Sequence, residues 1–319
     1  MRAGTPTARG RLRLLASCVL FAALPARADI YFLTVAGLGG EPDYEQRFQG
    51  LAADLDRVLK SGGTETHVLT VSGKDATRAH VVESMQSIAG QARPEDDFVL
   101  ILIGHGSFDG RQYKLNLVGP DVSGAALAQL CDRIASNRQL IVNTTSASGA
   151  SVGALQQRGR AVIAATKSGT EKNATVFARY WVEGLQDPTA DLDKNGSISA
   201  LEAFEYAAAK TAAFYESQKR LATEHAVFAD TGKGAAVRTA SATGAAGRLL
   251  SSVVLVRLGE ARQAAADPAK RGLLGRKDEL EQQIDTLKYQ RAAMSPQDYK
   301  RQLTDALVAL AKVQEELEK

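Results

Sequence analysis

Residues 98–107 read FVLILIGHGS, an apolar run that ends in glycine, histidine, glycine and serine. A continuous apolar run bounded by polar residues and glycine is typical of a strand buried on both faces of a sheet. Four further runs of this kind occur, at residues 30–35, 67–71, 139–143 and 161–165. Helix-patterned segments lie between them, at residues 44–59, 77–92 and 124–135. This alternation predicts a mostly parallel sheet with helices on both faces.

Side chains capable of chemistry follow two consecutive strands of this predicted sheet. His105 comes after the strand of residues 98–103, and the sequence TTSASG comes after the strand of residues 139–143. Open α/β sheets bind ligands at the carboxyl ends of their strands. Because the two strands are consecutive, we expect their ends to be neighbours. The sequence therefore predicts a site where the imidazole of His105 meets the hydroxyl of Ser146.

The pair His105-Gly106 and the run Ser146-Ala147-Ser148-Gly149 resemble motifs of the caspase/legumain-like cysteine peptidases. In that superfamily a catalytic histidine and a glycine follow one strand, and the nucleophilic cysteine ends the next. In legumains the cysteine is followed by any residue and then Ser-Gly, so Ser146 falls on the nucleophile position. The resemblance covers about residues 29–230. It implies a caspase-like three-layer α/β fold.

The nucleophile position holds serine where the resembled peptidases have cysteine. A serine hydroxyl is far less acidic than a thiol, so it needs a well-oriented base and an oxyanion hole. The resemblance implies that the backbone N–H groups of Ser146 and Gly106 form that hole. Asp109 is the nearest carboxylate in sequence that could orient His105. Cys131 lies on the apolar stripe of a predicted helix, where a buried structural thiol is expected.

Several functions remain open at this point. The chain can be a non-proteolytic homologue that holds a peptide or protein ligand in the strand-end cleft. It can be a hydrolase that uses a Ser146–His105 dyad, or His105 and Ser146 can have no joint role. It can also be a scaffold that binds a protein through its C-terminal helices. The resemblance places the specificity pocket at residues 166–170, with Arg158, Arg160 and Lys167 nearby.

Residues 191–202 read DLDKNGSISALE, which fits the 12-residue EF-hand calcium loop. Oxygen ligands stand at positions 1, 3, 5, 7 and 12: Asp191, Asp193, Asn195, Ser197 through its carbonyl, and Glu202. Gly196 permits the sharp turn, and Ser199 can act through water. Three carboxylates among hard oxygen ligands favour Ca²⁺ over softer metals, and Mg²⁺ would make poor use of a bidentate Glu202. The sequence contains no second loop, so we expect modest affinity and a structural role.

The N-terminal residues predict export. Basic residues precede an apolar run at residues 14–24, and Ala26-Arg27-Ala28 fits a cleavage site, so the mature chain would begin at Asp29. The run is too short to span a membrane. A lipoprotein anchored at Cys18 is a less favoured alternative. Either way the protein would be periplasmic or secreted. With a net charge of +3 and no long basic block, nucleic acid is not an expected partner.

The C-terminal region changes in composition. Residues 236–265 indicate a linker with a possible strand at 249–256, and residues 266–319 indicate an antiparallel helical hairpin. Apolar residues at spacings of 3 and 4 predict a coiled-coil seam, packed either on itself or on a partner. The predicted organisation is a signal peptide (1–28), a caspase/legumain-like domain (29–235), the linker and the hairpin. Tyr113–Val118 is predicted as a surface hairpin arm, and His67, His80 and His225 as isolated histidines.

Overall fold

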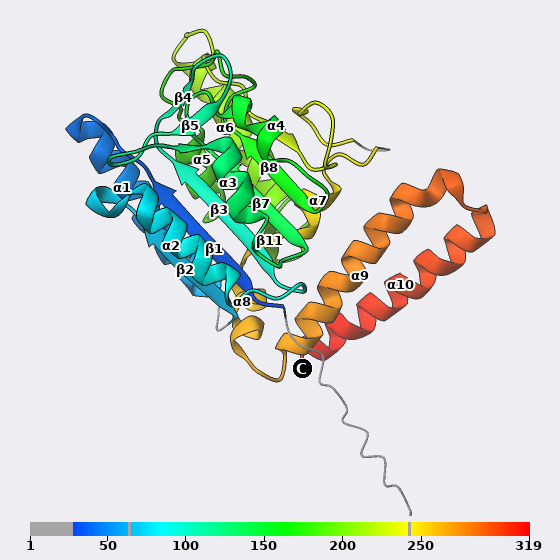
Figure 1. Cartoon of the computed structure of the whole chain (residues 1–319). Helices are drawn as coiled ribbons and strands as arrows, with labels where there is room; N and C mark the ends of the chain where they lie inside the picture. Colours follow the sequence, from blue (N-terminus) through cyan, green and yellow to red (C-terminus); the bar gives the residue numbers. More distant parts are fainter. Residues whose placement is uncertain (1–27, 63–64, 242–243) are drawn as a thin grey trace, which may run out of the picture.

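The computed structural model describes residues 28–62, 65–241 and 244–319. Apart from Ala28, the predicted signal peptide lies outside the described residues, and so does Cys18. The predicted fold class is confirmed: a mixed α/β body is built on a mostly parallel sheet of six strands, and a helical hairpin follows it (Figure 1).

The central sheet has the strand order β10-β8-β7-β3-β1-β2. Its strands are β1 (Ile30–Ala36), β2 (Thr66–Val71), β3 (Asp97–Ile103), β7 (Arg138–Asn143), β8 (Arg160–Ala164) and β10 (Val227–Ala229). All neighbours pair in parallel except β10, which runs antiparallel to β8. The five apolar runs found in the sequence are therefore the five parallel strands. Their side chains alternate between two apolar cores, so Phe32 faces one core and Leu33 faces the other.

Helices cover both faces of the sheet, which explains why the strands are apolar throughout. One core contains α1 (Pro42–Leu59), α5 (Phe177–Gly184) and α6 (Ala200–Ser217). The opposite core contains α2 (Arg78–Ala89), α3 (Gly124–Cys131) and α4 (Val152–Leu155). Short 3₁₀ turns complete the connections: η1 (Lys60–Gly62), η2 (Gly73–Asp75), η3 (Ser148–Ser151), η4 (Pro188–Ala190) and η5 (Arg291–Ala293).

The segment Tyr113–Val118 differs from its prediction. It lies in a small three-stranded sheet with the order β4-β5-β6, made of β4 (Gly106–Phe108), β5 (Tyr113–Leu115) and β6 (Val122–Ser123). Tyr113, Leu115 and Leu117 are buried in the core that contains α3 and α4. Alternating apolar residues do form a hairpin here, but their apolar face is covered, so the segment is not a surface arm.

Residues 236–265 contain more structure than a linker. They contain α7 (Arg248–Ser252) and β11 (Val254–Arg257), followed by α8 (Gly259–Ala266). The predicted strand at residues 249–256 is therefore wrong in its first half, which is helical, and is confirmed only from Val254 on. Strand β11 pairs in an antiparallel manner with β9 (Ser197–Ser199), and Leu250, Val253 and Leu255 belong to the core on the α1 side. The segment is therefore part of the folded body, because it packs into one of its two cores and pairs with β9.

The C-terminal hairpin consists of α9 (Arg271–Gln290) and α10 (Pro296–Leu317) and projects from the body (Figure 1). The Ser295 hydroxyl caps α10 by accepting a hydrogen bond from the Asp298 N–H, at 3.1 Å. The two helices pack on each other through a small core that includes Ile284, Leu287 and Ala306. None of the helices in the described residues is long and apolar enough to cross a membrane.

One buried carboxylate joins the end of β10 to α7, and its removal tests this architecture. Asp230 accepts hydrogen bonds from the N–H groups of Gly247, Leu249 and Leu250, at 2.9 to 3.5 Å. We expect Asp230→Asn to lower the free energy of unfolding by about 1–3 kcal/mol, because an amide places a donor against these N–H groups. Urea denaturation followed by the fluorescence of the buried Trp181 measures the loss.

Asp285→Asn is the matched control, because Asp285 is an exposed carboxylate paired with Lys288 at 3.1 Å. Equal urea midpoints for Asp230→Asn and Asp285→Asn would contradict the assigned role of Asp230.

Candidate functional site

The ends of β3 and β7 lie side by side, as the sequence predicts. Leu102 pairs with Asn143 at the last register position of the two strands. Beyond that point the chains remain in contact through Ser146. Its Oγ accepts a hydrogen bond from the Gly106 N–H at 3.1 Å and donates one to the Gly106 carbonyl at 3.0 Å. Ser146 is 2% exposed. Its side chain is therefore buried, and its hydroxyl both donates to and accepts from one glycine.

Gly106 must be glycine for this contact to form. A Cβ atom at position 106 would lie 2.4 Å from the Ser146 carbonyl oxygen and 2.5 Å from Tyr113. Such distances are shorter than van der Waals contact. The absent side chain lets the start of β4 pack directly on the end of β7. The N–H that the resemblance assigns to the oxyanion hole is the group that binds Ser146 Oγ.

His105 is oriented toward α1 rather than toward β7. Its ring makes edge-on contacts with Tyr44 and Phe48, at centroid distances of 4.8 and 5.1 Å. Burial lowers the pKa of His105 below its ordinary value, a hydrogen bond to the Gly39 backbone opposes the shift, and the nearby Arg47 charge adds to it. Within the described residues, no hydrogen bond joins His105 to Ser146. The fold thus brings the two backbone positions together and engages the two side chains separately.

Two other residues named in the sequence, Asp109 and Cys131, do not contact His105 or Ser146 in the structure. The Asp109 carboxylate accepts hydrogen bonds from the N–H groups of Arg111 and Gln112, each at 2.9 Å, in an exposed turn. Cys131 is buried in α3, as expected, and burial raises the pKa of its thiol to about 12. The Asp109 carboxylate is engaged within its own turn, and a protonated buried thiol is a poor nucleophile.

A buried polar network fixes the segment that carries Ser146. The Tyr113 hydroxyl contacts Thr145 Oγ1 at 2.7 Å and Asn143 Oδ1 at 3.2 Å, and Asn143 Nδ2 donates to Ser151 Oγ at 3.0 Å. Burial raises the pKa of Tyr113 to about 12, so the hydroxyl stays protonated. Because these partners satisfy one another, the end of β7 has a defined conformation. Ala147 adopts a left-handed backbone with φ of 54°.

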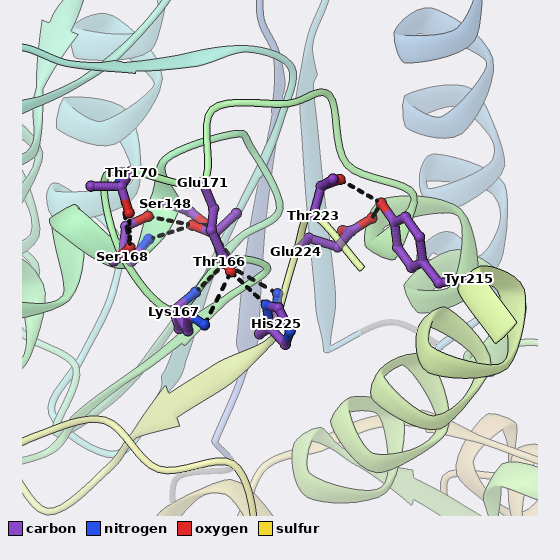
Figure 2. Close-up of polar contacts among 11 residues, drawn as sticks. Ser148, Thr166, Lys167, Ser168, Thr170, Glu171, Tyr215, Thr223, Glu224 and His225 are labelled. Atoms are coloured by element: carbon purple, nitrogen blue, oxygen red, sulfur yellow. Dashed lines mark hydrogen bonds and ion pairs between the residues drawn. The ribbon is translucent and has the colours of Figure 1, made fainter. Parts of the chain in front are cut away.

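The loop after β8 lies against the segment that carries Ser146. This loop contains residues 166–170, where the resemblance predicts a specificity pocket. Ser148 Oγ contacts Thr166 Oγ1 at 3.1 Å, and Ser168 contacts Thr170 at 2.8 Å (Figure 2). Thr166 is buried, whereas Lys167 and Thr170 are exposed. Arg160 is buried and donates to Gln139, Leu155 and Asp132, so its guanidinium is committed to the fold.

The structure also reveals an acid–histidine pair that the sequence analysis missed. His225 Nδ1 lies 2.5 Å from Glu171 Oε1, and Lys167 Nζ lies 3.7 Å from the same oxygen (Figure 2). The Glu171 carbonyl accepts a hydrogen bond from the Ala147 N–H at 2.8 Å, which places the pair beside the Ser146 segment. His225 and Glu171 are 54 residues apart in sequence, so no local pattern indicates their contact.

The predicted calcium loop brings three of its carboxylates together. Asp191, Asp193 and Glu202 each offer an oxygen, and these atoms lie within 4.8 Å of one another. Burial raises the pKa of Asp193, and the negative charges of Glu202 and Asp191 raise it further. Three hard oxygen donors in mutual repulsion form a group that a divalent cation would stabilise. The residues present therefore fit a calcium ion.

Backbone N–H groups hold the loop in shape. Asp191 accepts hydrogen bonds from the N–H groups of Asn195 and Gly196, at 3.1 and 3.0 Å. Gly196 has a φ of 83°, which favours glycine at this turn. Glu202 also accepts from the Ser199 N–H and caps α6 through a capping box. Strand β9, which lies within the loop, pairs in an antiparallel manner with β11.

The comparisons with known proteins give no family assignment. No protein-family model matches the chain, and no curated protein matches its sequence. The chain is similar to the protein GSU0716 of Geobacter sulfurreducens, with 13% identity and a TM-score of 0.42, over 65% of this chain and 95% of that one. It is also similar to the Drosophila initiator caspase Dronc, with 10% identity and a TM-score of 0.41, over 66% and 82% of the two chains.

The burial of His105 predicts a low pKa that NMR can measure. We expect its imidazole to titrate below the ordinary value of about 6.5, because the charged form is poorly hydrated between Tyr44 and Phe48. A folded-state pKa below the unfolded value means that the protein loses stability as the pH falls through about 6.5. The urea-unfolded protein provides the reference titration. A folded-state midpoint above that reference would contradict the prediction, because it would mean that the negative charge of Glu41 outweighs the burial of His105.

Proposed function

We propose that this protein is an exported, caspase-like peptidase homologue that binds a peptide or protein ligand at its strand ends without cleaving it. The observation that carries the proposal is the double hydrogen bond between Ser146 Oγ and the Gly106 backbone. A serine nucleophile requires a base within hydrogen-bond reach and free oxyanion donors. Here the hydroxyl occupies one of those donors, and His105 contacts α1.

A ligand-binding role is supported by the loop that follows β8. Lys167 and Thr170 are exposed, and the loop is anchored to the Ser146 segment through Glu171 and Ala147. Exposed polar side chains on a fixed backbone can bind a partner with little loss of backbone conformational entropy. The proposed ligand therefore contacts residues 167–170 beside the buried serine.

We further propose that one calcium ion stabilises the connection between α5 and α6. Its ligands would be the side chains of Asp191, Asp193, Asn195 and Glu202, and the Ser197 carbonyl. The support is the loop sequence together with the clustered carboxylate oxygens. Export, which rests on the N-terminal sequence, would place the protein where calcium is abundant enough for a loop of modest affinity.

Serine-directed chemistry tests the non-proteolytic proposal. We expect a fluorophosphonate probe to leave Ser146 unlabelled, because its hydroxyl is buried and lacks a base. We expect Ser146→Ala to lower the free energy of unfolding by about 1–3 kcal/mol, because it removes both hydrogen bonds to Gly106. Ser217→Ala is the control, since the Ser217 hydroxyl donates only to the exposed end of α6. Labelling at Ser146, or peptidase activity that Ser146→Ala abolishes, would establish a hydrolase instead.

Calorimetric titration tests the calcium proposal. We expect Ca²⁺ to bind with a stoichiometry of about one and to raise the melting temperature, because it binds the folded state. Glu202→Gln should weaken binding at least about ten-fold by removing a charged ligand of similar shape. Glu216→Gln is the control because it removes an exposed carboxylate from the same helix. Absence of calcium binding in the wild-type protein would refute this part of the proposal.

A further inference from the structure

Helix α9 of the C-terminal hairpin lies against the proposed calcium loop, more than 80 residues away in sequence. Lys277 Nζ donates a hydrogen bond to the Asn195 carbonyl oxygen. Asn195 Nδ2 donates to Glu281 Oε2 at 3.2 Å. Lys277 and Glu281 are one helical turn apart, with 3.6 Å between the ammonium and the carboxylate. One turn of α9 therefore holds both the backbone and the side chain of Asn195.

The neighbouring strand strengthens the same contact. Arg257 of β11 binds both carboxylate oxygens of Asp278, at 3.2 and 2.6 Å. The next residue, Leu258, donates its N–H to the Gly196 carbonyl at 2.8 Å. Two routes thus join α9 to the loop, one direct and one through β11.

Asn195 occupies the fifth position of the loop, where its side-chain oxygen would be a calcium ligand. Its amide nitrogen lies 3.2 Å from both Asp193 Oδ2 and Glu281 Oε2. These two acceptors hold the amide nitrogen, while Asn195 Oδ1 accepts a hydrogen bond from the Ser197 N–H at 2.8 Å. Glu281 thereby holds the side chain of a proposed ligand, and it lies close enough to Asp193 for their negative charges to repel each other.

We propose that Glu281 completes the cation site from outside the loop, so that calcium binding and docking of the hairpin stabilise each other. This inference rests on the proposed calcium site. The Lys277 and Glu281 side chains are 12% and 25% exposed, so solvent screens their interactions only in part. Coupling between two binding events is reciprocal. Whatever Glu281 adds to calcium affinity, calcium adds to the attachment of α9.

Glu281→Gln tests the coupling with little change in shape, and a glutamine can still accept the hydrogen bond from Asn195. Calcium titrations at about pH 8, where carboxylates are ionised, should show an affinity about five-fold lower or weaker still. Glu279→Gln is the matched control, because Glu279 is an exposed carboxylate on the same helix that pairs with Arg276. The control should bind calcium as the wild-type protein does.

Hydrogen exchange of the wild-type protein provides a second, independent measurement. Calcium should slow the exchange of the backbone amides of residues 271–290, and Glu281→Gln should remove most of that protection. If wild-type protein binds no calcium, both the calcium proposal and the coupling fail. If it binds calcium, but Glu281→Gln matches Glu279→Gln and exchange in α9 does not change, the coupling alone is wrong.

Discussion

The contact between Ser146 and Gly106 is the constraint on which the functional end of the molecule depends. Parallel strands β3 and β7 end side by side, and their chains must then diverge into different loops. One buried hydroxyl satisfies both polar groups of Gly106, and the missing side chain of Gly106 lets the chains remain in contact. The small sheet β4-β5-β6 begins at this contact. The polar network around Tyr113 and Asn143 therefore packs against a segment whose backbone position is fixed by the contact between Ser146 and Gly106.

The same contact separates this strand-end arrangement from that of a working nucleophile. Donating its proton to the Gly106 carbonyl stabilises the Ser146 hydroxyl in its neutral form, and the same Oγ occupies the N–H that would bind an oxyanion. The imidazole that should activate it is packed against the aromatic rings of α1, where the neutral form is favoured. The hydrogen bonds of Ser146 and the aromatic packing of His105 both support the proposal that the protein does not hydrolyse peptides. The exposed loop after β8 presents polar side chains beside the buried Ser146.

The sequence predicted the five parallel strands because they read as apolar runs and four of them, β1, β3, β7 and β8, are buried on both faces, but it missed β10, which is only three residues long. It also predicted that His105 and Ser146 follow adjacent strands. It could not predict where their side chains point, because orientation depends on tertiary neighbours such as Tyr44 and Gly106. The burial of Tyr113 was missed because alternation does not reveal whether an outer face is covered. Contacts such as Glu171 with His225, or Asn195 with Glu281, join residues too distant for any local pattern.

The central claim is that the Ser146 hydroxyl serves the fold rather than catalysis. A high-resolution crystal structure of residues 29–319 grown with calcium measures this most directly, through the distances from Ser146 Oγ to its neighbours. The account predicts hydrogen bonds of about 3 Å to both the N–H and the carbonyl of Gly106, with the His105 ring between Tyr44 and Phe48. A His105 nitrogen within hydrogen-bond distance of Ser146 Oγ, with the Gly106 N–H free, would contradict it.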